Sequence, residues 1–180
     1  MGRRPYQPAS PGKVERESGC GPSSGQPNGV DPPRTEGFLF PASTIDPATR
    51  QAYLETHYLV HGDTPLALQI GIANPSLTAL YKTQCAGSCA FITACNPWGQ
   101  SLDAAANAKR QSALATDLQQ HGLTFVEGIG QHPSNHWPGE ASFLVWDLSL
   151  EAAKALGIAH EQNAIVWCGP DAVPRLITLQ

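Results

Sequence analysis

Short apolar segments alternate with segments that carry helix start signals, and this alternation constrains the fold more than any other sequence feature. Residues 89–95, CAFITAC, are short and largely apolar, which is typical of a buried strand. Ser101 can then cap a helix over 101–120, and an apolar strand over 123–129 follows. Strand 142–148, helix 149–158 and strand 164–168 repeat the succession, which predicts two βαβ units.

The remaining expected elements flank these units on both sides. They are helices over 46–58 and 75–84 and strands over 65–72 and 175–179. Together the segments predict an α/β (or α+β) domain with a mixed, mostly parallel sheet and helices packed on it. A polar loop that is too short for a crossover joins strands 123–129 and 142–148, so this pair should form a β-hairpin.

The first 36 residues differ in composition from the rest of the chain. They contain seven Pro, six Gly and four Ser and almost nothing apolar. Such a segment buries too little surface to offset its ordering entropy, so we expect residues 1–36 to be a disordered tail. Residues 37–180 should then form a single globular domain.

Charge and hydropathy exclude several classes of partner. The formal net charge of −4 does not favour binding to nucleic acid. The sequence lacks the run of about 18 apolar residues that reads as a membrane span, so we expect no membrane association. Five cysteines, two of them inside apolar runs, are typical of reduced thiols, which predicts a cytoplasmic protein.

Polar residues are expected to converge at one sheet edge if both βαβ units form. Asn96 follows the first strand, the loop 131–136 follows the second, and Glu140 precedes the next strand. Gln162 and Asn163 precede strand 164–168. The N-terminus of helix 101–120 should also point to this edge, with backbone N–H groups open to an anion or a carbonyl.

Glu140 is the candidate catalytic residue, because a partly buried carboxyl group beside an indole has a raised pKa and suits acid–base chemistry. Alternatively, Glu140 anchors its own loop or pairs with Arg110. The candidate ligand-binding residues are Asn96, Asn107, Arg110, Gln162, Asn163, Trp98, Trp137, His132 and His136. For the polar residues among them, the alternative roles are turn-forming hydrogen bonds, a solvated helix face and solvated loop histidines.

The cysteines do not favour a metal site. Cys85 and Cys89 have a spacing compatible with zinc, but no second close pair supplies the other ligands. Cys95 could act as a nucleophile with His132 or His136 as base, although a buried inert thiol is the simpler interpretation. Nucleotide-binding, hydrolase and zinc-protease motifs are absent from the sequence, and we expect neither a metal nor a cofactor.

Four blocks, ITACNPWGQ, AANAKRQ, WPGEASFLV and QNAIVW, occur in this order between residues 92 and 167. They resemble the motifs of a bacterial family known as domain of unknown function 3293, and the likeness extends over about residues 45–179. The resemblance places the polar signature of the family on Asn96, Pro97, Asn107, Glu140, Gln162 and Asn163. It implies no activity.

Two functions are consistent with these observations. The first is a small-molecule domain that binds or transforms a polar metabolite at the edge formed by Asn96, Glu140 and Gln162; its ligand would be a small polar or anionic molecule. The second is a non-catalytic protein-interaction or regulatory module, in which the same residues only fix loops. The sequence does not identify a protein partner.

Overall fold

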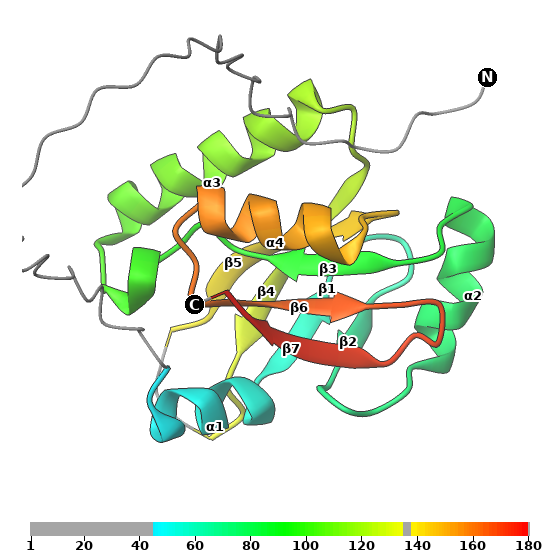
Figure 1. Cartoon of the computed structure of the whole chain (residues 1–180), viewed down its shortest axis with the longest axis horizontal. Helices are drawn as coiled ribbons and strands as arrows, with labels where there is room; N and C mark the ends of the chain where they lie inside the picture. Colours follow the sequence, from blue (N-terminus) through cyan, green and yellow to red (C-terminus); the bar gives the residue numbers. More distant parts are fainter. Residues whose placement is uncertain (1–44, 135–137, 180) are drawn as a thin grey trace, which may run out of the picture. The chain divides into compact units, whose positions relative to one another are not determined.

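The computed structural model describes residues 45–134 and 138–179. The predicted tail over 1–36, together with residues 37–44, lies outside the described residues. Within the described ranges the chain forms one seven-stranded sheet and four α-helices (Figure 1). Their bounds are α1 Pro47–Glu55, β1 His57–Val60, β2 Leu66–Leu68, α2 Pro75–Gln84, β3 Cys89–Ile92, η1 Pro97–Gly99, α3 Ala104–Gln120, β4 Phe125–Gln131, β5 Glu140–Trp146, α4 Leu150–Ala159, β6 Ala164–Cys168 and β7 Pro174–Thr178.

The sheet is antiparallel throughout, so the predicted α/β fold with a mostly parallel sheet is wrong and the fold is α+β. The strand order is β2-β1-β4-β5-β3-β6-β7, and each neighbouring pair is antiparallel. The two strands of each expected βαβ unit do run in the same direction. They are not neighbours, however, because β5 lies between β3 and β4, and β3 lies between β5 and β6.

This interleaving is the split βαβ arrangement. The hairpin between β4 and β5 pairs Phe125 with Val145 and Gly130 with Glu140. On its other side, β5 pairs with β3, so that Ile92 lies opposite Phe143. Apolar periodicity identified these strands but not their neighbours, because an interleaved unit and a simple unit have the same order of elements along the chain.

The first helix and the first strand also differ from the prediction. Asp46 caps α1 as expected and accepts hydrogen bonds from the backbone N–H groups of Ala48 and Thr49. The helix ends at Glu55 rather than near Tyr58, because Thr56 is extended. Residues 57–60 then form β1, which the sequence analysis missed and which pairs with both β2 and β4.

The helices cover the two faces of the sheet. α3 and α4 lie on one face (Figure 1) and bury Leu114, Leu118 and Leu156 against the sheet. On the opposite face, α2 buries Leu77 and Tyr81 in a second apolar cluster. Among the described residues, no helix is both long enough and apolar enough to cross a membrane.

The sheet is curled into a half-barrel, and its two edges approach each other at one end. The Gly71 N–H donates to the Pro174 carbonyl over 2.8 Å, and the Asn74 N–H donates to the Ala172 carbonyl over 3.0 Å. The Asn74 side chain also donates to the Ala67 carbonyl of β2 over 2.9 Å. The segment after β2 is therefore tied to the start of β7 at the far edge of the sheet.

Gly128 tests the close packing of β4 against its neighbours. A Cβ atom at this position would lie 2.6 Å from the Leu59 carbonyl oxygen and 2.7 Å from Phe91 Cε2. We expect Gly128→Ala to lower the free energy of unfolding by about 1–3 kcal/mol, the usual cost of overpacking, measured by denaturant titration. Gly87→Ala is the control, because a Cβ there meets nothing within 4 Å. Equal stability of the two variants would contradict the register of β4 between β1 and β5.

Candidate functional site

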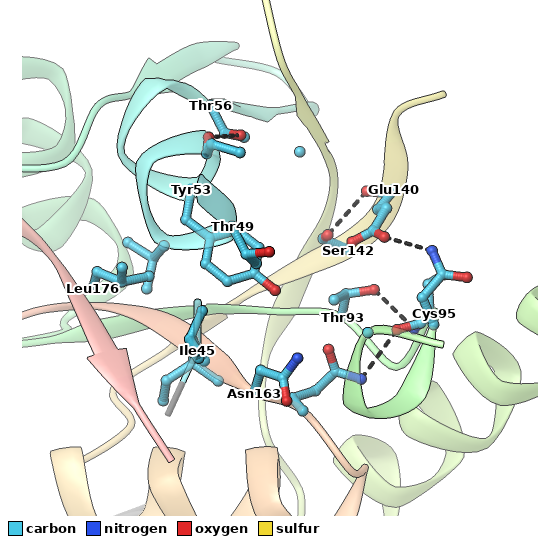
Figure 2. Close-up of a pocket in the computed structure, with 18 of the residues that line it drawn as sticks. Ile45, Thr49, Tyr53, Thr56, Thr93, Cys95, Glu140, Ser142, Asn163 and Leu176 are labelled. Atoms are coloured by element: carbon cyan, nitrogen blue, oxygen red, sulfur yellow. Dashed lines mark hydrogen bonds between the residues drawn. The ribbon is translucent and has the colours of Figure 1, made fainter. Parts of the chain in front are cut away.

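A cavity of about 470 Å³ lies on the concave face of the sheet, on the opposite side from α3 and α4. Helix α1 forms one wall, and the sheet supplies residues from β1, β3, β5, β6 and β7 or from their ends. In Figure 2, labelled side chains from α1, β5 and β7 and from the segments next to β3 and β6 point into the same space. The lining includes six residues whose side chains can form hydrogen bonds or exchange a proton: Tyr53, Thr93, Cys95, Glu140, Gln162 and Asn163.

Asn96 stands at the turn between β3 and η1 and links three chain segments. Its backbone is left-handed, with φ 49° and ψ 63°, a conformation that Asn tolerates better than most residues. Its side-chain oxygen accepts hydrogen bonds from the Leu102 N–H and from Asn107 Nδ2, each over 3.0 Å. Its Nδ2 donates to Glu140 Oε1 over 2.5 Å, and its backbone N–H donates to Asn107 Oδ1. Asn96 therefore fixes the position of the Glu140 carboxyl group.

Arg110 and Gln162 hold the backbone behind the cavity. Arg110 donates to the Ala94 carbonyl over 2.8 Å and to the His160 carbonyl over 3.0 Å, and it pairs with Glu161 over 2.9 Å. Gln162, which is buried, donates to the Cys95 and His160 carbonyls. Of the two, only Gln162 lines the cavity, and Asn107 also lies outside the lining.

Glu140 is the first residue of β5, and its carboxyl group faces the cavity (Figure 2). Burial raises the pKa of Glu140, and the hydrogen bond from Asn96 opposes this shift. Its second oxygen, Oε2, accepts no hydrogen bond from any residue within 45–134 or 138–179. One oxygen is therefore held by the protein, and the other is available to a ligand or to a proton.

Tyr53 and Asn163 reach the same space from two other elements (Figure 2). Tyr53 comes from α1 and Asn163 from the turn before β6. Burial raises the pKa of Tyr53, an interaction with the Asn163 side chain opposes that shift, and the Glu140 charge adds to it. The sequence analysis missed α1 as a wall of the site. The available signal was the helical spacing of Thr49, Tyr53 and Thr56, all of which line the cavity.

The predicted aromatic and histidine residues have different placements. Trp98 lines the cavity at its exposed side, and its backbone N–H donates to the Glu161 carbonyl. His132 also lines the cavity, and its Nε2 lies 3.1 Å from Glu55 Oε2. Predicted site residues His136 and Trp137 lie outside the described residues.

Neither a nucleophilic cysteine nor an anion site at the start of α3 gains support from the geometry. Burial raises the pKa of Cys95, which keeps it a thiol, and its Sγ lies 3.7 Å from the Ala141 carbonyl oxygen. Near the start of α3, the N–H groups of Leu102 and Ala106 already donate hydrogen bonds to the side chains of Asn96 and Asp103. Within the described part of the chain, no three His, Cys, Asp or Glu residues are grouped to hold a metal ion.

Replacement of Asn96 tests the network that holds Glu140. We expect Asn96→Gly, which keeps the left-handed backbone accessible, to lower the free energy of unfolding by about 1–3 kcal/mol because hydrogen-bonding partners are left unpaired. Asn96→Ala should cost about 1–2 kcal/mol more, because alanine also strains the backbone. Denaturant titration measures both values. A wild-type stability for Asn96→Gly would contradict a stabilising role of the network.

The raised pKa of Glu140 predicts a definite pH dependence of stability. The folded protein holds this proton at pH values where the unfolded chain, with an ordinary pKa near 4.5, has released it. The contribution of Glu140 is therefore complete below that pH and is lost as the pH rises through the folded-state pKa. We expect the free energy of unfolding of wild type, minus that of Glu140→Gln, to fall as the pH rises.

The exposed Glu151 on α4 provides the matched control for this measurement, because Glu151→Gln removes the same charge outside the cavity. The free energy of unfolding of wild type minus that of Glu151→Gln should not show the pH dependence expected for Glu140→Gln. A wild-type advantage over Glu140→Gln that grows with pH would show that the carboxylate, rather than the acid, is stabilised in the folded protein.

Comparison with known proteins gives one match. Residues 92–165 match the family model described as "Protein of unknown function (DUF3293)". No curated protein and no solved structure matches the chain. The matched range contains Asn96, Asn107, Glu140, Gln162 and Asn163, whereas α1 with Tyr53 precedes it. The resemblance of the sequence motifs to this family is confirmed over residues 92–165, the range that the DUF3293 model matches.

Proposed function

We propose that the cavity binds a small polar molecule and that Glu140 is the group that accepts its hydrogen bond or exchanges a proton with it. The observation that carries the proposal is Glu140 Oε2, which accepts no hydrogen bond from the described residues and faces the cavity that Tyr53 and Asn163 also line. An apolar concave pocket with a few convergent polar groups is the usual form of a small-molecule site.

The polar residues of the site have two separate roles under this proposal. The first role is structural. The side chains of Asn96, Asn107 and Arg110 form hydrogen bonds with other groups of the protein and so set the positions of the segments around the cavity. Glu140, Tyr53 and Asn163 contact the ligand. A rigid outer layer of this kind holds the contact groups in one geometry before the ligand arrives, which reduces the entropic cost of binding.

The same arrangement suits proton transfer, which makes an enzymatic form of the proposal concrete. A buried carboxyl group with a raised pKa is suited to act as a general acid or base. Glu140 would be the general acid or base, and Tyr53 and Asn163 would orient the substrate. The reaction is one that moves a proton at a substrate atom beside Glu140 Oε2.

One observation favours the alternative of a non-catalytic interaction module. The side-chain bonds of Asn96, Asn107 and Arg110 all end on other groups of this chain. Three of the motif residues are therefore accounted for by structure alone. Under this alternative Glu140 would also be structural, and the cavity would have no small-molecule ligand.

A thermal-shift screen of polar metabolites separates the two functions. We expect at least one compound to raise the melting temperature of wild type and of Glu151→Gln, the surface control. Its affinity should fall about tenfold or more in Glu140→Gln, because one hydrogen bond to a charged group is worth about 1.5–3 kcal/mol. Tyr53→Phe should also weaken binding while it preserves the ring packing.

The contrary result has two forms. If each compound acts equally on wild type and Glu140→Gln, Glu140 is not a ligand contact. If native mass spectrometry of freshly purified protein shows a stoichiometric protein partner and no small molecule, the interaction module is the better description.

A further inference from the structure

We infer that the ligand of this cavity is an organic cation, with a protonated amine directed at Glu140 and an apolar body against the floor of the sheet. This inference rests on the proposed function, because it names the ligand class of the same site. Three properties of the described lining residues support it: their charges, the direction of their hydrogen bonds, and the apolar surface between them.

The charges of the lining favour a cation over an anion. Among the described residues that line the cavity, Asp46 and Glu140 are acidic, and none is Lys or Arg. Arg110 lies behind the cavity, where two carbonyls and Glu161 occupy its guanidinium group. His132, which also lines the cavity, lies 3.1 Å from Glu55. A carboxylate or phosphate ligand would face Glu140 without a counter-charge, which costs binding energy, whereas an ammonium group would be paired.

The hydroxyl groups of the lining act as hydrogen-bond donors within the protein. Thr93 donates to the Ala141 carbonyl over 2.8 Å, and Ser142 donates to the Glu140 carbonyl over 3.0 Å. On the α1 and β1 side, the hydroxyl groups of Thr49, Thr56 and Tyr58 likewise donate to Asp46, Ala52 and Tyr53.

A hydroxyl group has one hydrogen to donate, so these five oxygens can offer a ligand only their lone pairs. Glu140 Oε2, when ionised, is an acceptor as well. These six groups therefore offer acceptors to a ligand, whereas the Tyr53 hydroxyl and the Asn163 side-chain amide, which also line the cavity, can still donate. An ammonium group, which carries three donors and no acceptor, fits such a lining better than a carbonyl, a carboxylate or a phosphate.

The floor of the cavity supplies the surface for an apolar body. Tyr58 and Phe91 meet edge to face with their ring centroids 5.3 Å apart, and Val166 and Leu176 continue this surface toward β7. Aromatic rings also attract a nearby cation through their π faces. The volume of about 470 Å³ falls within the range of small-molecule sites, so the ligand can be a single-ring or short-chain amine.

Proton release should accompany binding of such a cation. Burial raises the pKa of Glu140 while the cavity holds no cation, and a bound ammonium group would lower it again by favouring the carboxylate. The other titratable groups that face Glu140 or share its cavity are Cys95, Tyr53, Tyr58 and His132, together with Asp46 on the far side. Amine affinity should thus increase as the pH rises through the pKa of Glu140.

Two triplets of compounds test the inference on the full chain: 2-phenylethylamine, 2-phenylethanol and phenylacetate, and hexylamine, 1-hexanol and hexanoate. Each triplet keeps one apolar body and changes only the polar group. Binding is followed by NMR shifts of the cavity amides in wild type, Glu140→Gln and Glu151→Gln. We expect each amine to bind wild type about tenfold or more tightly than its alcohol, and the carboxylates to bind more weakly still.

Glu140→Gln should reduce amine binding about tenfold, leave alcohol binding unchanged and abolish the pH dependence. If this variant does not fold, the wild-type pH titration decides, because affinity that is flat or falls with rising pH overturns the inference. Alcohols or carboxylates that bind as tightly as the amines also overturn it, and the metabolite screen on Glu140 then still decides the proposed function. A lack of cavity shifts with all six compounds overturns the inference and leaves that screen as a separate test.

Discussion

The pairing of β5 with both β3 and β4 determines where the rest of the site lies. Strand β5 is inserted between β3 and β4, the two strands of one βαβ unit. Its first residue, Glu140, therefore lies beside the end of β3. The same interleaving brings the start of β6, with Gln162 and Asn163 before it, to this end of the sheet. Three connections that are distant in sequence thereby surround one carboxyl group.

The directions of these strands could be predicted from the sequence, and their neighbours could not. A crossover helix requires its two strands to run in the same direction whether or not a third strand separates them. For this reason Asn96, Glu140 and Gln162 were expected at one edge, and the structure brings them together although the parallel sheet was wrong. Tyr53 was not predicted as a site residue. The sequence analysis extended the first helix to residue 58 and so did not recognise β1, the strand that positions α1.

The motif residues also show what residue type alone leaves open. Asn96 and Arg110 each carry groups that could bind a ligand, but whether those groups are free depends on tertiary contacts. Asn96 is bonded to Leu102, Asn107 and Glu140, and Arg110 is bonded to backbone carbonyls that face it across the fold. Glu140 differs because only one of its two oxygens is engaged by the described residues. This difference separates a supporting residue from a candidate contact residue.

The contact between the two edges of the curled sheet has a consequence for behaviour at high concentration. An open antiparallel sheet presents unpaired N–H and C=O groups along both outer strands, and another chain can extend it. Here Gly71 and Asn74 use the carbonyls of Pro174 and Ala172, and the Asn74 side chain occupies the Ala67 carbonyl of β2. The Ala67 carbonyl of β2 and the Pro174 carbonyl of β7 are thus bonded within one chain, which leaves fewer groups on the outer strands for edge-to-edge pairing with a second molecule.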